Sequence, residues 1–247
     1  IMVAARLVKE GEAEALISAG STGAALASAA FVIGRLKGVS RPAIASVFPT
    51  REVVLDVGAN LDVRPHHLAQ FGVMGSAVAK VFLDVADPRV GLLNIGEEAG
   101  KGRDLEKEAH DLLAEAEGIN FIGNVEGRDL GRSRADVFVT DGFTGNVLLK
   151  TGEGTSRALF RLLLEAMQAE KYQTALAELM PAFMELRQLI DPETIGGAHL
   201  VGTKGVVVIS HGASSHRAVA NAIRMAAEGA DHGLVELIAD GIERARG

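Results

Sequence analysis

Glycines and short polar residues follow directly after six short apolar runs of the sequence. These runs precede the segments 20–23, 58–62, 96–102, 124–127, 141–146 and 211–212. Each glycine alone is explained by a turn that requires a positive φ. Because ligands of α/β proteins bind where strands end, the six turns together indicate backbone amides arranged around one ligand.

The turn Gly20-Ser21-Thr22-Gly23 separates a strand pattern from an alanine-rich helix pattern. Amides and two hydroxyls at a helix N-terminus would suit an anion. Ordinary N-capping by serine or threonine accounts for the same residues. No Gly-Lys-Ser/Thr follows and the spacing is not GxGxxG, so the turn alone is weak evidence for a nucleotide.

Cationic and amide side chains lie near two of the other turns. Lys101 lies between two glycines in the loop that also holds Asn94 and Glu97, and it could contact phosphate as a point charge or simply be solvated. Asp141 and Asn146 frame the segment DGFTGN, where the aspartate could orient a ligand or cap the helix. Lys150 is one helical turn after Asn146 and therefore shares its face.

His211 is the histidine best placed for chemistry, because it directly follows the apolar run 206–210 in a glycine turn. It could act on a substrate, or it could be a hydrogen-bonded structural residue. The seven histidines form no HExxH pair or three-ligand cluster, so no zinc site is predicted. No GxSxG nucleophile elbow occurs.

The apolar runs alternate with helical patterns and predict a layered α/β fold with a mostly parallel sheet and helices on both faces. Strands are predicted at 15–19, 43–48, 53–57, 90–95, 119–123, 136–140 and 206–210. Helices are predicted near 2–10, 22–36, 66–86, 103–117, 144–168, 170–190, 214–228 and 232–246.

Residues 155–195 interrupt this alternation, since two amphipathic helical patterns follow one another with no strand between them. They predict a helical hairpin that projects from the sheet. Its apolar faces favour a core or dimer contact over a membrane-facing surface.

Composition excludes several classes of protein. The 247 residues carry a net charge of −7, which is unfavourable for wrapping nucleic acid. Cysteine is absent, so there is no disulfide, thiolate metal site or cysteine nucleophile. The uncharged segment 15–34 has the length of a membrane span, but its central Gly-Ser-Thr-Gly favours a buried strand, turn and helix.

Several segments resemble, in order, the acyl-acyl-carrier-protein:phosphate acyltransferases of bacterial phospholipid synthesis. They are SAGSTGA (18–24), LDVGAN (55–60), VGLLNIGEEAGKG (90–102), INFIGNVEG (119–127), DGFTGNVLLKT (141–151) and the segment 205–212. The resemblance covers essentially the whole chain. We expect the family's N-terminal segment, with its first strand turn, to be missing before Ile1.

The resemblance implies a fold like that of isopropylmalate dehydrogenases and phosphate acetyltransferases. It implies one catalytic unit over 1–247 with a protruding hairpin at 155–195, without metal or organic cofactor. The substrates would be acyl carrier protein, as its acyl thioester, and inorganic phosphate. The resemblance further implies a cytoplasmic homodimer at the membrane surface, where a downstream glycerol-3-phosphate acyltransferase could be a partner.

We assign hypothetical roles to the candidate residues on this basis. Gly20, Ser21, Thr22, Gly23 and Lys101 would hold phosphate. Asn146 and the turn Gly123–Asn124 would face the thioester oxygen or the pantetheine arm. Asp141 would orient Lys101 or Lys150, and His211 would protonate the leaving thiolate. Substrate contacts are also expected from Asn60, Asn94, Glu97 and Lys150.

Two alternatives remain open. One is a phosphate acetyltransferase or a decarboxylating dehydrogenase on the same fold, although a dehydrogenase should cluster carboxylates for a divalent metal. The sequence instead disperses its strand-end acids at Asp62, Glu97, Glu98 and Asp141. The other is a non-catalytic scaffold at the membrane, whose hairpin recruits the next acyltransferase.

Overall fold

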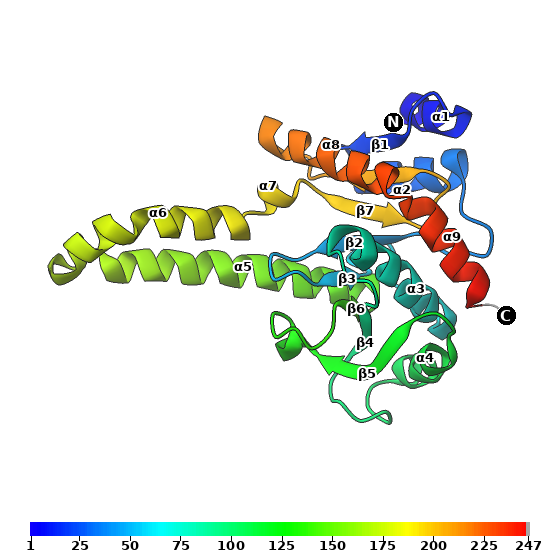
Figure 1. Ribbon diagram of the computed structural model, residues 1–247, viewed down its shortest axis with the longest axis horizontal. Coiled ribbons are helices and arrows are strands. Elements are labelled where there is room, and N and C mark those ends of the chain that lie inside the picture. The colour runs from blue at the N-terminus through cyan, green and yellow to red at the C-terminus, as the bar shows by residue number, and fades with distance from the viewer. Residues whose placement is uncertain (246–247) are drawn as a thin grey trace.

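The computed structural model describes residues 1–245 and contains one eight-stranded sheet with helices on both of its faces (Figure 1). The strands are β1 (Ala15–Ser18), β2 (Ala43–Val47), β3 (Val53–Leu55), β4 (Arg89–Asn94), β5 (Asn120–Glu126), β6 (Val137–Val139), β7 (Ala198–Val201) and β8 (Val206–Ile209). The predicted α/β class is confirmed.

The sheet has the order β1-β8-β7-β2-β3-β6-β4-β5. The pairs β1–β8, β3–β6, β6–β4 and β4–β5 are parallel, whereas β2 and β7 run antiparallel to both of their neighbours. It follows that β1 and β8 point opposite to β3, β4, β5 and β6. The six strand ends therefore do not share one edge of the sheet, because those of β1 and β8 lie opposite to the other four. Residues of four of the six turns nevertheless line one cleft.

Successive side chains of the buried strands point alternately into two apolar cores, one on each face of the sheet. Val53 and Leu55 of β3 contact the core under α3 (Pro65–Phe82), α4 (Asp104–Glu115) and α9 (Leu234–Arg244), with α8 (His216–Asp231) beside it over β8. Val54 points to the other face, where α1 (Met2–Glu10), α2 (Thr22–Ser28) and a π-helical turn (Ala29–Ile33) pack. Continuous apolar strands are required because both faces are covered.

The strand-turn-helix prediction for residues 15–34 is confirmed by β1 and α2. Within residues 1–245, no helix combines the length and apolar character needed to cross a membrane. The seven predicted strands are present, but β7 was not predicted. It has only four residues, begins beside Gly196 and Gly197, and includes a histidine, so its sequence lacks a strand pattern.

The predicted hairpin consists of α5 (Gly142–Met167) and α6 (Gln173–Ile190), which lie side by side and project from the sheet (Figure 1). A short 3₁₀ turn (Glu170–Tyr172) joins them, and α7 (Pro192–Ile195) leads back to β7. The α6 helix has no buried residue among those described, and Leu159 and Leu189 are 61% and 55% exposed. The hairpin thus displays apolar side chains that the described chain does not cover.

Candidate functional site

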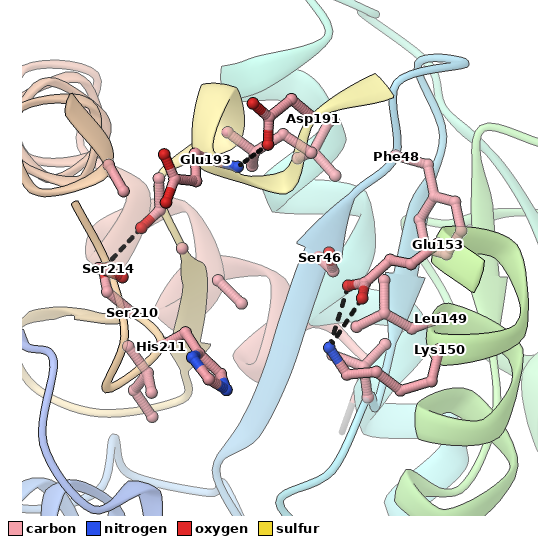
Figure 2. A pocket seen from close by; sticks show the side chains of 18 of the residues that line it. Ser46, Phe48, Leu149, Lys150, Glu153, Asp191, Glu193, Ser210, His211 and Ser214 are labelled. Atoms are coloured by element: carbon pink, nitrogen blue, oxygen red, sulfur yellow. Dashed lines mark hydrogen bonds and ion pairs between the residues drawn. The ribbon is translucent and has the colours of Figure 1, made fainter. Parts of the chain in front are cut away.

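A cleft of about 950 Å³ lies on the face of the sheet that carries α5. Its floor includes Ile44, Ser46 and Phe48, which are alternate residues along β2 and just beyond it. Figure 2 shows this floor between α5 on one side and the β8–α8 loop on the other. The volume is in the range of small-molecule sites.

The β8–α8 loop forms a polar wall of the cleft with Ser210, His211 and Ser214. The backbone N–H of Ala213 donates to Nδ1 of His211 at 3.2 Å. A neutral imidazole that accepts at Nδ1 carries its hydrogen on Nε2. His211 therefore presents a donor toward the cleft (Figure 2), while the hydroxyl of Ser210 is already donated to the carbonyl of Gly196 at 2.6 Å.

The opposite wall is the first part of α5, from Asn146 to Arg157. Asn146 Nδ2 donates to the carbonyl of Val57 at 3.0 Å, which attaches the helix to the turn after β3. Lys150 Nζ lies 3.0 Å from Glu153, and Arg157 also contacts this carboxylate at 3.3 Å. Two cations share one carboxylate, so this wall retains one net positive charge, whereas Asp191 and Glu193 line the cleft beside α7.

A buried aspartate fixes the turn on which α5 rests. The carboxylate of Asp56 accepts hydrogen bonds from the backbone N–H groups of Ile44, Gly58, Ala59 and Asn60 and from the Asn60 side chain, at 2.7–3.1 Å. Burial raises the pKa of Asp56, and these hydrogen bonds oppose the rise. The side chain of Asn60 also donates to Pro42, so both of its amide hydrogens hold the turn.

Asp141 is the N-cap of α5, and its carboxylate accepts from the backbone N–H and hydroxyl of Thr144 at 2.8 Å. The cation beside it is Arg103, at 3.2 Å. The prediction that Asp141 orients Lys101 or Lys150 is therefore wrong. Asp141 has instead the alternative role considered from the sequence, that of an N-cap.

A second group of predicted residues gathers where β4 and β5 end. Asn94 Nδ2 donates to the carbonyl of Lys101 at 3.0 Å, and buried Asn124 donates to the carbonyl of Glu98 at 2.8 Å. Both amides thus brace the loop that carries Lys101, whose own side chain is exposed. Gly123 and Asn124 lie within β5 and not in the predicted turn, and Gly123 has a φ of 90°.

Glu97 belongs to a cluster of charged side chains beside this loop. Its carboxylate lies within 4.8 Å of those of Glu126 and Asp129. Arg134 contacts Glu97 at 2.6 Å and lowers the pKa of that carboxyl, and it also contacts Asp129 at 3.4 Å. Arg134 and Arg128, which lies 3.7 Å from Glu97, thus offset part of the charge of the three carboxylates.

The structure brings four of the predicted site residues to the cleft, namely Thr22, Asn146, Lys150 and His211. Lys101, Asp141, Asn60, Asn94, Glu97, Gly123 and Asn124 are not among the described residues that line it, and neither are Gly20, Ser21 and Gly23. In addition, β1 and β4 are six strand spacings apart, roughly 29 Å. A single phosphate therefore cannot contact both the Gly20–Gly23 turn and Lys101, and that prediction is wrong.

Sequence reasoning missed Ser46, Phe48 and Glu153, all of which line the cleft. Ser46 had a signal, because it is the polar residue within the apolar run AIASVF. Phe48 and Glu153 had none, since they resemble an ordinary core aromatic and an ordinary i,i+3 salt-bridge partner.

Comparisons with known proteins agree with this architecture and identify the family. Residues 1–237 match the family model described as "Fatty acid synthesis protein". A phosphate acyltransferase of Pelotomaculum thermopropionicum is 49% identical over 249 residues, which cover 98% of this chain and 72% of that protein. A phosphate acyltransferase of Desulfitobacterium hafniense is 49% identical over 244 residues, covering 96% and 72%.

Two solved structures share the fold. EutD phosphotransacetylase from Staphylococcus aureus superimposes with a TM-score of 0.58 at 19% identity, covering 93% of this chain and 67% of its own. A branched-chain phosphotransacylase from Enterococcus faecalis gives 0.54 at 15% identity, covering 92% and 77%. The resemblance inferred from the sequence motifs is confirmed: the chain belongs to the fatty acid synthesis protein family, together with relatives named phosphate acyltransferase.

Proposed function

We propose that this protein transfers the acyl group of an acyl-carrier-protein thioester to inorganic phosphate. An oxygen of hydrogen phosphate attacks the thioester carbonyl, the carbon–sulfur bond breaks, and the proton of the phosphate ends on the leaving sulfur. The products are an acyl phosphate and the free thiol of the carrier protein. The reaction needs no redox cofactor, because no electrons leave or enter.

The observation that carries this proposal is the pairing of His211 with a positively charged wall across one cleft. Lys150 and Arg157 would attract the phosphate, and Thr22 would donate to it. The Nε2 hydrogen of His211 would pass to the sulfur, and the ring would regain a proton from the phosphate. Because phosphate is already an anion, alignment against the thioester would supply much of the rate.

The direct test is incubation of the purified protein with palmitoyl carrier protein and phosphate, followed by measurement of acyl phosphate and free thiol. His211→Ala should reduce kcat/KM by about 100-fold or more, since a positioned acid or base typically contributes that much. His216→Ala is the matched control, because His216 is exposed at the start of α8 and does not line the cleft.

Equal activity of the two histidine variants would remove His211 from the reaction. An acetyl-coenzyme A arm in the same assay distinguishes the proposed activity from a phosphate acetyltransferase. Absence of turnover with every thioester would instead favour the scaffold alternative.

We expect different effects on the phosphate kinetics from alanine substitutions at Lys150 and at Lys101. Lys150→Ala removes a cation from the cleft wall and should lower kcat/KM for phosphate roughly 10- to 100-fold, mainly through KM. Lys101→Ala changes an exposed loop side chain and should leave phosphate kinetics within about twofold. Initial rates at varied phosphate check both variants, and the reverse pattern would restore the site predicted from the sequence.

The proposal extends to the assembly: one catalytic unit that forms a homodimer and associates with the cytoplasmic membrane surface through the hairpin. The product, with an apolar tail, would there reach a downstream glycerol-3-phosphate acyltransferase. The exposed apolar residues of α5 and α6 support a contact with a lipid surface or a second copy.

A charge on the hairpin tests the membrane contact. Leu163→Asp and Met180→Asp, at side chains that are 41% and 37% exposed, should reduce binding to anionic phospholipid vesicles while activity on soluble carrier protein is retained. Thr174→Asp adds the same charge at an exposed polar position and serves as the control. Vesicle sedimentation gives the binding and light scattering gives the oligomeric state. Loss of the dimer without a change in vesicle binding would assign these residues to subunit contact.

A further inference from the structure

Phe48 closes the corner of the cleft where the floor meets α5. Its side chain is only 8% exposed and belongs to the apolar cluster that includes Ile44 and, at its margin, Leu149. Its Cε1 atom would lie 3.6 Å from a Cβ added at Gly152, so the ring is seated directly against the α5 backbone. Figure 2 shows Phe48 and Leu149 on the far side of β2 from His211, with the side chain of Glu153 between them in this view.

The two walls of the cleft differ in the chemistry they offer to a substrate. The wall at His211 presents hydroxyl and imidazole groups. The opposite side presents the apolar side chains of Phe48 and Leu149 together with the charged ends of Lys150, Glu153 and Arg157. An acyl chain whose carbonyl is held near His211 would therefore extend across β2 toward Phe48. Each methylene removed from water there would strengthen binding about 4-fold.

We propose that Phe48 is the specificity-determining residue that limits the length of the acyl chain. This inference rests on the proposed function, because it assumes that the acyl group occupies the cleft. The ring forms the end of the apolar corner, so a chain that fits up to the ring is favoured and longer chains are rejected. Smaller side chains at this position lengthen the corner, and larger ones shorten it.

The test compares wild type with Phe48→Ala, Phe48→Leu and Phe48→Trp across a series of saturated acyl carrier proteins from octanoyl to stearoyl. The optimum in kcat/KM should move to longer chains in the alanine and leucine variants, with a gain of about 4-fold for each additional methylene accommodated. The tryptophan variant should move it to shorter chains. Phe31→Ala is the matched control, because Phe31 is 87% exposed and does not line the cleft.

Phe48→Leu keeps much of the apolar volume and remains informative where the alanine variant is too unstable to assay. An unchanged rank order of chain lengths in the folded Phe48 variants would overturn the proposal.

A second measurement separates failure of this inference from failure of the proposed function. Calorimetric titration of each protein with free saturated fatty acids reports the chain length that the cleft accepts without any turnover. A shift of the preferred fatty acid in the Phe48 variants supports the inference even where wild type transfers no acyl group. Turnover of acyl carrier protein with no shift in either assay overturns the role of Phe48 and leaves the proposed function standing.

Discussion

Gly145→Val is expected to yield little folded protein under conditions where the wild type is stable. A Cβ at Gly145 would lie 1.9 Å from the backbone oxygen of Asp56, far inside any permitted contact. That oxygen cannot move freely, because five hydrogen bonds to the Asp56 side chain fix the turn. The start of α5 would have to leave the sheet, at a cost of at least about 3 kcal/mol.

Urea denaturation followed by circular dichroism measures this effect. Gly154→Ala is the matched control on the same helix, since a Cβ there meets nothing within 4 Å. The control should be stabilised by up to about 1 kcal/mol, because alanine favours helix over glycine. A Gly145→Val protein with wild-type stability would show that α5 does not pack on the Asp56 turn.

His199→Leu is expected to remove a large part of the acid sensitivity of the fold. His199 is 1% exposed, its ring lies 4.4 Å from that of Phe82, and neither ring nitrogen has a hydrogen-bond partner within residues 1–245. Burial lowers its pKa from 6.5 to about 3. Below pH 6.5 the unfolded chain therefore binds a proton at His199 that the folded chain does not bind. The free energy of unfolding consequently decreases as the pH is lowered.

The expected contribution of His199 to this loss is about 3 kcal/mol between pH 7 and pH 4. Urea unfolding at both pH values measures it as the difference between wild type and His199→Leu, because groups common to both proteins cancel. His216→Leu, at an exposed position, should retain the wild-type dependence. Parallel pH profiles of wild type and His199→Leu would show that this ring accepts a proton in the folded state.

The layered fold was predictable because burial on both faces leaves a local mark, the unbroken apolar runs such as Val53–Leu55. Strand direction leaves no such mark. The antiparallel placement of β2 is decided by partners far along the chain, with Ala45 opposite His199 on one side and Leu55 on the other. For that reason the sequence did not reveal that the six strand ends lie at two opposite edges of the sheet.

The candidate site was predictable where a residue follows a strand or opens a helix, as His211 and Asn146 do. Lys101 follows a strand as well, but that strand belongs to the part of the sheet beyond β6, away from the cleft. Phe48 and Glu153 line the cleft from the floor and from the interior of a helix. Only the packing of α5 against the sheet turns such positions into a binding surface, so local sequence could not reveal them.

Alternate residues of β2 belong to the two different faces of the sheet, so the two faces can change independently. Ala43 and Ala45 belong to the core under α3, whereas Ile44, Ser46 and Phe48 face the cleft. A substitution at Ile44, Ser46 or Phe48 changes the lining of the cleft and leaves the side chains of the opposite core in place. Single substitutions along β2 can therefore reshape the cleft without changing the side chains packed under α3.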